Sequence, residues 1–378
     1  MTHENIAPLS KLYERHSSKW RRFPSDVLPM HVAEMDFEIA EPIKRVLIEM
    51  VSNSDIGYLG PTPEIADAFE GFALRHWGWQ IDKKQLRLAT DVGVATVEYL
   101  RYNLKPGERV IITTPVYNGF HHWLEELHVE PVQVDLLRAG NVWSLDLDAI
   151  EEQFKAGNTT ILLSNPHNPT GTAFTREELT ALAAIARKHG ATVISDEIHA
   201  PLTHSAKFTP FLDCGEDARE VGICITSSSK SFNLAGLKIA FALTQSVNMN
   251  EKAAKLPEAA HWRSSILGAF AMASAFSEGD EWLAQTNETI RENAEHLVLE
   301  LARLLPEIKT HVPDASYLAW LDLSDFSMTT EEIFEKAKVA FVPGPDMGGE
   351  AFKNFARMNI GTSKEIITAA LERIAAAR

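Results

Sequence analysis

The middle of the chain alternates short apolar runs with amphipathic segments. The runs are rich in β-branched residues and nearly free of charge, which is typical of strands buried on both faces of a sheet. The candidate strands are Val110–Thr113, Thr160–Ser164, Thr192–Ser195, Ile223–Thr226 and Ile239–Leu243.

An amphipathic segment lies between the second and third of these strands. Thr175 and Glu178 are spaced as a capping box, an apolar face follows, and Gly190 stands where the helix ends. A helix between two strands gives a right-handed crossover and therefore a mainly parallel sheet. The pattern predicts an α/β fold with a large α/β/α domain built on that sheet.

The last hundred residues have a different pattern. One long amphipathic helix is followed by a strand and two further helices: Glu278–Leu305, Ser316–Asp322, Thr330–Lys338 and Ser363–Ala377. We interpret this region as a smaller α+β domain, with which the N-terminal arm up to about Asp36 packs. The predicted division is residues 36–274 for the large domain and residues 1–35 with 275–378 for the small one.

Composition narrows the class of protein. A chain of 378 residues with 45% hydrophobic and 23% charged residues suits a globular enzyme of two domains. The net charge of −16 disfavours nucleic acid as a partner. No run approaches the ~20 apolar residues of a membrane span, and no signal-peptide core follows the N-terminus. With only two cysteines, Cys214 and Cys224, we expect a cytoplasmic protein.

Polar side chains follow three of the predicted strands. Asn165-Pro-His-Asn-Pro-Thr-Gly171 follows the second, Asp196-Glu-Ile-His199 follows the third, and Ser227-Ser-Ser-Lys230 follows the fourth. Ligands of open α/β sheets bind beyond the carboxyl ends of the strands. An amide, a carboxylate with an imidazole, and a lysine are therefore expected to meet at one site.

These groups match the requirements of pyridoxal 5′-phosphate (PLP). A lysine amine condenses with its aldehyde, and a carboxylate keeps its pyridine nitrogen protonated, so that the ring acts as an electron sink. An amide and an imidazole can bond to the phenolic oxygen. Hydroxyls and N–H groups near a helix start can hold the phosphate.

In order and spacing, the Asn168-Pro-Thr-Gly171 turn, the Asp196-x-x-His199 pair and the Ser227-x-x-Lys230 box resemble the fold-type I PLP enzymes of the aspartate-aminotransferase superfamily. The resemblance covers nearly the whole chain. It implies that Lys230 forms the Schiff base and Asp196 pairs with the pyridinium nitrogen. Asn168 and His199, the latter replacing the tyrosine of many relatives, are expected to contact the phenolic oxygen.

The resemblance also implies a phosphate site. Val92 and Gly93 would offer backbone N–H groups, and Ser227 and Lys238 would complete the site. Lys238 stands where many aminotransferases carry arginine, so the charge is kept but not the bidentate fork. Tyr58 would reach the phosphate from the other subunit, and we therefore expect a homodimer with shared active sites.

Three further positions are implied in the reaction. Tyr117 would stack on the cofactor ring and is grouped with Lys230 and Asp196 as catalytic. Arg357 would bind the substrate carboxylate bidentately, with Asn168 and Ala33 beside the substrate.

Within the superfamily, the chain is most similar to the MalY/PatB group of cystathionine β-lyases. The segments that carry this similarity are His31-Val-Ala-Glu-Met-Asp-Phe37, Asp196-Glu-Ile-His-Ala200, Ser229-Lys-Ser-Phe-Asn-Leu-Ala-Gly236, Ser316-Tyr-Leu-Ala-Trp-Leu-Asp322 and Pro343-Gly-Pro-Asp-Met-Gly348. Pro201 and Glu34 depart from the group, because aspartate usually stands at both positions.

This similarity implies a PLP-dependent carbon–sulfur β-lyase that converts L-cystathionine or related S-substituted cysteines into pyruvate, ammonia and a thiol, with methionine biosynthesis among the possible pathways. An aminotransferase would use the same cofactor contacts and stays the alternative. A regulatory binding protein on the same scaffold is a third hypothesis, because fold does not settle function.

Structural interpretations remain open beside the chemical ones. Lys230 could be a solvated surface residue, Arg357 part of a surface ion pair, Asp196 a helix cap and His199 a core histidine. Asn168 could be a turn residue and Tyr117 a core residue. The adjacent His121 and His122 invite a metal site, but no carboxylate or cysteine pattern accompanies them, and we expect no metal.

Overall fold

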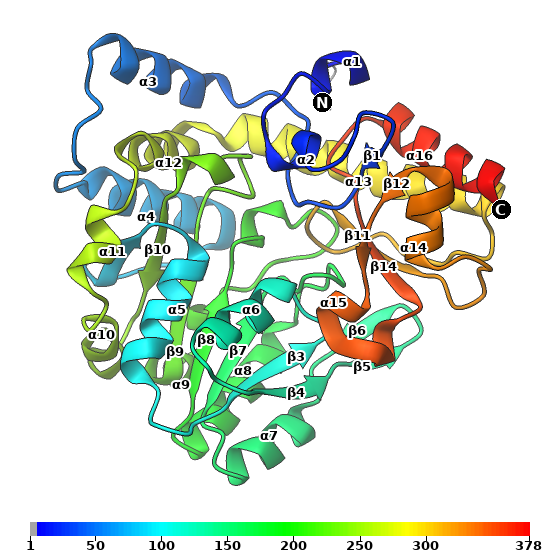
Figure 1. Ribbon diagram of the computed structural model, residues 1–378. Helices are drawn as coiled ribbons and strands as arrows, with labels where there is room; N and C mark the ends of the chain where they lie inside the picture. The colour runs from blue at the N-terminus through cyan, green and yellow to red at the C-terminus, as the bar shows by residue number, and fades with distance from the viewer. Residues whose placement is uncertain (1–5) are drawn as a thin grey trace.

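A computed structural model describes residues 6–378 and is organised around one central sheet (Figure 1). Residues 1–5, the start of the predicted N-terminal arm, lie outside the described part of the chain. None of the described helices combines the length and apolar character needed to cross a membrane.

The central sheet has seven strands in the order β2-β10-β9-β8-β7-β3-β4. Their bounds are β2 Leu86–Ala89, β3 Val110–Thr114, β4 Pro131–Asp135, β7 Thr160–Ser164, β8 Thr192–Asp196, β9 Gly222–Thr226 and β10 Ala240–Leu243. Strands β4, β3, β7, β8 and β9 pair in parallel, and β10 pairs antiparallel with both β9 and β2. The prediction of a mainly parallel sheet is confirmed, whereas the edge strands β2 and β4 were missing from the predicted set.

Helices cover both faces of this sheet, which gives the predicted α/β/α layers (Figure 1). Alternate residues of each strand point to opposite faces, so Ile111 of β3 belongs to one core cluster and Ile112 to the other. One layer contains α5 Val92–Asn103, α6 Asn118–Glu126 and α10 Val247–Ala253. The other contains α4 Pro63–Trp77, α7 Leu147–Lys155, α8 Arg176–Lys188, α9 Glu216–Val221 and α12 Ile266–Glu278.

The predicted crossover helix is α8. Its N-cap Thr175 and Glu178 make the reciprocal bonds of a capping box, as the sequence predicts. Gly190, two residues after the last helical residue, has a positive φ of 63° that glycine adopts without strain.

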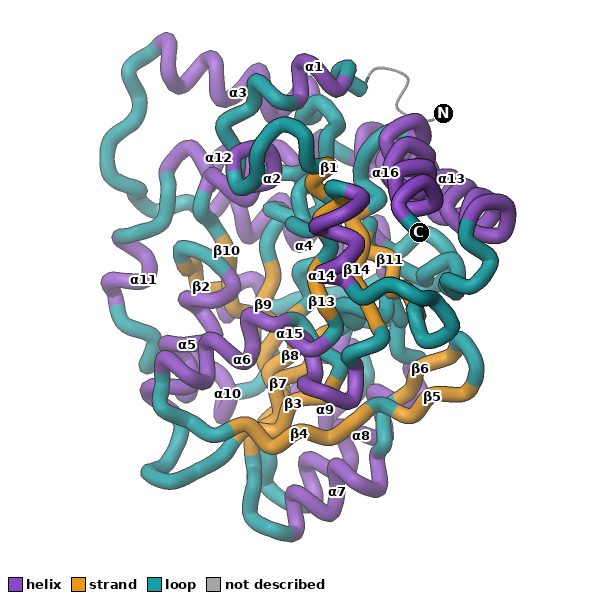
Figure 2. The backbone as a smooth tube through the Cα atoms, turned by 45° about the vertical axis from the view of Figure 1, so that its right-hand side comes forward, coloured by secondary structure: helices purple, strands orange, loops and turns teal. Residues whose placement is uncertain are grey.

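The C-terminal region contains the long helix α13 Asp280–Leu304, a three-stranded antiparallel sheet and the last helix, α16 Lys364–Ala377. The strands are β11 Leu318–Asp322, β14 Phe355–Asn359 and β13 Val342–Pro343. Helices α13 and α16 lie side by side (Figure 2).

Two predicted helices of this region have different bounds in the structure. Glu278 is the last residue of α12, and α13 begins after Gly279. A Cβ at Gly279 would lie 2.4 Å from both the Ala275 carbonyl oxygen and the Phe232 ring, so this junction requires glycine. The predicted helix Thr330–Lys338 is the short α14 Thr330–Glu332 followed by a π-helical turn over Ile333–Ala337.

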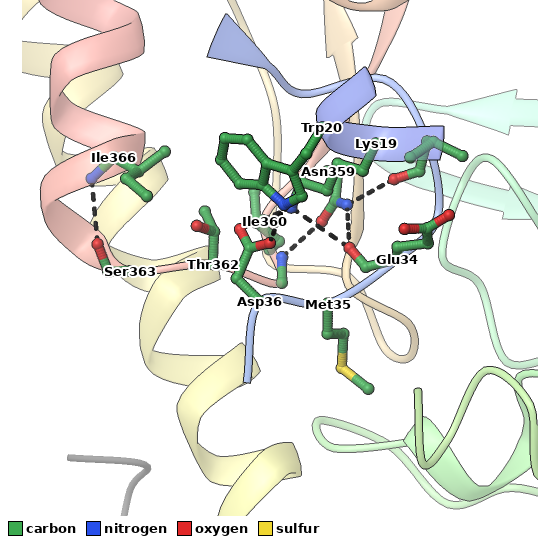
Figure 3. Close-up of polar contacts among 12 residues, drawn as sticks. Lys19, Trp20, Glu34, Met35, Asp36, Asn359, Ile360, Thr362, Ser363 and Ile366 are labelled. Atoms are coloured by element: carbon green, nitrogen blue, oxygen red, sulfur yellow. Dashed lines mark hydrogen bonds and ion pairs between the residues drawn. The ribbon is translucent and has the colours of Figure 1, made fainter. Parts of the chain in front are cut away.

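The N-terminal arm is attached to the C-terminal region. Its strand β1 Leu28–Pro29 pairs in parallel with β12 Val339–Ala340. The buried Asp36 carboxylate accepts bonds from Lys19 Nζ at 2.7 Å and Trp20 Nε1 at 3.0 Å (Figure 3). The Asn359 amide donates to the carbonyl oxygens of Val32 and Glu34 at 2.6 and 2.7 Å. The domain boundaries at residues 36 and 275 stay a prediction.

Candidate active site

One cavity of about 430 Å³ opens at the carboxyl ends of the central strands. Ser164 of β7 is in register with Asp196 of β8, and Asp196 is in register with Ile225 of β9, so these strands end at the same level. The loops that follow carry their polar side chains into the cavity, whose opposite wall is formed by the N-terminal arm and β14.

Lys230 lies in the turn after β9 and is one of the cavity-lining residues. Its Nζ donates to the backbone carbonyl of Ala33 in the arm at 2.9 Å, and Tyr317 donates its hydroxyl to the same carbonyl at 3.0 Å. Burial lowers the pKa of Lys230 to about 8, and the positive charge of Arg357 acts in the same direction. An amine with this pKa is partly neutral near neutral pH and can act as a nucleophile or base.

Asp196 ends β8 and lines the same cavity with little exposure. Its Oδ1 accepts the Ile198 N–H at 3.1 Å, and burial raises the pKa of its carboxyl group to about 7. A cationic partner placed in the cavity would favour the ionised form again. The neighbouring Glu197 instead accepts bonds from the Ser195 hydroxyl and the Phe211 N–H, and so has a structural role.

His199 and Asn168 line the cavity beside Asp196. Burial lowers the pKa of His199 to about 3, so the ring is neutral. Its buried Nδ1 has no hydrogen-bond partner among the described residues. Asn168 Oδ1 accepts a bond from Arg357 Nη1 at 3.1 Å.

Arg357 reaches the cavity from β14 and is 4% exposed. Its Nη2 donates to the His31 carbonyl at 3.1 Å, while its buried Nε has no partner within residues 6–378. Burial lowers its pKa to about 10, which leaves it cationic at neutral pH. No carboxylate of the described chain lies within ion-pair distance of this guanidinium, so it is available to an anionic ligand.

The start of α5 forms another part of the wall. The first-turn N–H groups of Val92 and Gly93 have no acceptor within the helix, and both residues line the cavity. The N-cap Asp91 accepts the Val94 N–H and pairs with Lys238 Nζ at 3.1 Å. The Trp123 ring packs against Gly93, where a Cβ would lie 2.9 Å from it.

Two of the expected phosphate ligands lie outside the cavity wall. The Ser227 hydroxyl donates to the Ile239 carbonyl at 2.6 Å and accepts the Ser229 N–H, so it is used within the turn. Ser229 lines the cavity in its stead. Tyr58 is 88% exposed between α3 Glu41–Ser52 and α4, and its expected place in the site requires a second subunit.

Tyr117 lines the cavity at the start of α6. Its ring meets Trp123 edge to face at 5.8 Å, and burial raises its pKa. A side chain at Gly119 would clash with this ring, since a Cβ there would lie 2.2 Å from it. The small residue therefore leaves room for Tyr117 beside the cavity.

The sequence interpretation missed several lining residues. Arg22, His31, Asp91 and Trp123 contribute to the wall. Asp91 had a signal, because an aspartate between a strand and a helix is a common N-cap. His31 opens the His31–Phe37 segment but had no assigned role, and Arg22 lies in a basic stretch without any motif.

The residues present fit PLP. The orphaned Nδ1 of His199 can bond to a phenolic oxygen, and the start of α5 can hold a phosphate. Asp196 can pair with a protonated ring nitrogen, and Lys230 offers the amine for the aldehyde. No group of three metal-ligating side chains is found in residues 6–378, His121 and His122 included.

Comparisons with known proteins show which family the chain resembles. The family model "Aminotransferase class I and II" matches residues 26–374. The cystathionine β-lyase PatB of Bacillus subtilis is 31% identical over 360 residues, 93% of each chain. A candidate PLP-dependent β-cystathionase from Corynebacterium diphtheriae matches with a TM-score of 0.93 and 31% identity over 98% of each chain. Cystalysin from Treponema denticola, whose crystal structure contains PLP, matches with a TM-score of 0.89 and 25% identity over 100% of this chain and 97% of that one.

Proposed function

We propose that this chain acts as a carbon–sulfur β-lyase. The chain belongs to the aminotransferase class I and II family and is a PLP-dependent enzyme of the aspartate-aminotransferase fold. Its substrates would be L-cystathionine or related S-substituted cysteines, and its products pyruvate, ammonia and a thiol. The observation that carries the proposal is the convergence of Lys230, Asp196 and Arg357 on one cavity.

The chain's own residues supply the cofactor contacts. When bound, PLP withdraws electrons from the Cα of the amino acid and stabilises negative charge there. Asp196 would hold the proton on the pyridine nitrogen, and His199 would bond to the phenolic oxygen. The N–H groups of Val92 and Gly93, together with Lys238, would bind the phosphate.

Arg357 and Lys230 act on the substrate. Arg357 binds the α-carboxylate and so orients the Cα–H bond. The Lys230 amine, whose pKa is about 8, takes the Cα proton as general base. The electron pair left on Cα then forms a Cα–Cβ double bond as the C–S bond breaks, the sulfur leaves with the electrons of that bond, and the proton on Lys230 is available to the departing thiolate. Water hydrolyses the released 2-aminoacrylate to pyruvate and ammonia.

Product analysis tests this proposal. Holoenzyme with L-cystathionine is expected to release pyruvate and homocysteine without any added 2-oxo acid. Absence of pyruvate from cystathionine, S-alkyl cysteines and cystine alike would contradict the β-lyase function. Turnover that requires a 2-oxo acid would identify an aminotransferase.

We also propose that the enzyme is a cytoplasmic homodimer whose Tyr58 completes the partner's phosphate site. Ile48, Val51 and Ile56 lie within ten residues before Tyr58 in sequence and are each 58–59% exposed, and exposed apolar side chains favour burial against a second copy. Sedimentation velocity is expected to give twice the 42.0 kDa chain mass. Tyr58→Ala should weaken cofactor binding, whereas Tyr102→Ala, at another exposed tyrosine, should not.

A further inference from the structure

Two side chains of the cavity wall have no role in the chemistry described so far. His31 is 5% exposed, and neither of its ring nitrogens has a hydrogen-bond partner among the described residues. Burial and nearby cations lower the pKa of His31 to about 4, so its ring is neutral at pH 7 and offers one donor and one acceptor. A buried ring with both nitrogens unsatisfied is costly unless a ligand pairs with it.

Arg22 lies beside His31. The Phe23 ring meets the His31 ring at 4.8 Å, and the guanidinium carbon of Arg22 lies 5.7 Å from the centre of that Phe23 ring. Both Arg22 and His31 line the cavity. Neighbouring basic residues have partners within the protein. Arg15 contacts Asp36, and Arg21 donates a hydrogen bond to the Arg15 carbonyl. Among residues 6–378, no hydrogen bond or ion pair is found for the Arg22 guanidinium.

The charges of the cavity leave Arg22 unmatched. Four cations line the wall, Arg22, Lys230, Lys238 and Arg357, against the two carboxylates Asp91 and Asp196. Lys238 is paired with Asp91 at the phosphate end, Arg357 serves the α-carboxylate, and Lys230 serves the reaction. Arg22 is exposed at the edge of the cavity and has no partner within residues 6–378, so its guanidinium is available to a second anionic group on the ligand.

The backbone places this pair next to the α-carboxylate clamp. The carbonyl of His31 accepts the bond from Arg357 Nη2, so the His31 ring belongs to the same wall as Arg357 but extends it toward the exposed Arg22. A substrate held by Arg357 at one end could therefore place another part of its structure against Arg22 and His31, which line the same cavity.

We propose that Arg22 and His31 form a second anion-binding subsite, which holds a carboxylate at the far end of the substrate's S-substituent. The inference rests on the proposed β-lyase function and narrows its substrate class to β-thio amino acids with acidic tails. Arg22 supplies the charge, and the neutral His31 ring donates one hydrogen bond to the same carboxylate.

A matched pair of substrates tests the subsite. S-(2-carboxyethyl)-L-cysteine and its terminal amide have the same length, and β-elimination from both releases pyruvate. Holoenzyme is expected to prefer the acid by about 10-fold or more in kcat/KM. Arg22→Gln should lower kcat/KM for the acid by about 10- to 100-fold, chiefly through KM, and change that for the amide by less than about 3-fold.

Two further variants complete the test. His31→Phe keeps the ring shape and should lower kcat/KM for the acid by about 3- to 10-fold. Arg21→Gln removes the adjacent exposed arginine, which does not line the cavity, and should leave both substrates unaffected. Equal use of acid and amide by the parent, with no change in Arg22→Gln, would overturn the subsite while the β-lyase function stood.

A ligand that binds but cannot react tests the subsite separately from the β-lyase function. 2-Aminopimelate replaces the sulfur by a methylene and has no leaving group. Calorimetry on holoenzyme should give it a dissociation constant about 10- to 100-fold higher for Arg22→Gln than for the parent or Arg21→Gln. If that difference appeared but neither cysteine derivative gave pyruvate, the subsite would stand and the β-lyase function would fall. Equal dissociation constants in all three proteins would overturn the subsite.

Discussion

The carboxyl edge of the central sheet and the N-terminal arm face each other across one cavity, but different contacts build them. On the sheet side, Asn168, Asp196 and Lys230 each lie at or within four residues of a strand end. Parallel pairing alone brings these ends together. On the arm side, residues 18–36 contain one two-residue strand and a four-residue helix and are held by partners distant in sequence, above all Asn359.

This contrast teaches where chemistry can be inferred from sequence. A residue that follows a buried strand has its position set by the regular geometry of the sheet. A residue of the arm has its position set by single side-chain contacts, such as the Asn359 bonds and the Lys19–Asp36 pair. We therefore expect substitutions on the sheet side to affect mainly the catalytic rate. Substitutions on the arm side should affect mainly the free energy of unfolding.

The largest effect should follow Lys230→Ala, on the sheet side. Loss of Lys230, the proposed base for the Cα proton, is expected to lower kcat for pyruvate release by about 10³-fold or more. Lys252 is a matched control, because it is a half-buried lysine whose pKa is also lowered by burial, at the opposite end of β8 beside Thr192. If Lys252→Ala were as damaging as Lys230→Ala, the assignment of the base would be wrong.

The next effect concerns the arm. Asp36→Asn leaves Lys19, which is 1% exposed, as a buried and unpaired cation, and the free energy of unfolding in urea should fall by about 3–5 kcal/mol. Asp67→Asn breaks an ion pair of the same 2.7 Å length at the surface, with Lys83, and should leave stability nearly unchanged. Equal losses from both would show that the arm is not held by this buried pair.

A smaller effect is the pH dependence of stability that comes from Asp196, on the sheet side. Burial raises the pKa of Asp196 from 3.8 to about 7, so between these values the folded protein binds more protons than the unfolded chain. Its contribution to stability therefore falls as pH rises through that window. Cofactor-free Asp196→Asn should be more stable than the cofactor-free parent at pH 8, by at least about 1 kcal/mol, although it is impaired in catalysis.

The pH dependence supplies the check. The advantage of Asp196→Asn should shrink as pH falls from about 7 toward 4. Lys230→Met should behave in the opposite sense, because burial lowers the Lys230 pKa from 10.5 to about 8, and its advantage should shrink as pH rises through that range. An advantage of Asp196→Asn that does not depend on pH would exclude the carboxyl group as its source.

The smallest effect concerns the hydrogen bonds to the Ala33 carbonyl, which connect the arm to the rest of the cavity wall. Tyr317→Phe removes one of the two hydrogen bonds to the Ala33 carbonyl and leaves the one from Lys230. The free energy of unfolding should fall by about 0.5–1.5 kcal/mol in urea titrations. Tyr99→Phe is the control, since its buried hydroxyl has no partner in the described part of the chain, and its loss should be neutral or stabilising.

Much of the fold followed from local patterns. The capping box of α8 and the apolar runs of β3, β7, β8 and β9 depend on neighbours in the chain, and all were predicted within a residue or two. Edge strands β2 and β4 were not, because Arg87, Gln133 and Asp135 interrupt their apolar pattern. The helix boundary at Gly279 depends on Phe232, a contact that no local pattern contains.

The site residues also fall into those that local sequence predicts and those that only the three-dimensional structure shows. The side chains of Lys230, Asp196 and His199 lie in the cavity where the strand-end argument places them, while their roles stay predictions. The Ser227 hydroxyl bonds to the Ile239 carbonyl, and only the three-dimensional turn shows this. Arg22 and His31 reach the cavity because the arm folds back over β14, a placement that depends on contacts more than 300 residues apart in sequence.

The Asn359 bonds to Val32 and Glu34 also bear on biosynthesis. A ribosome makes residues 31–36 early and residues 357–361 among the last of the described chain. The wall that holds the Ala33 carbonyl and the Arg357 guanidinium cannot form until both segments are available. The cavity is therefore completed only after residues 357–361 have been synthesised, when the central sheet, whose last strand ends at Leu243, has already had time to fold.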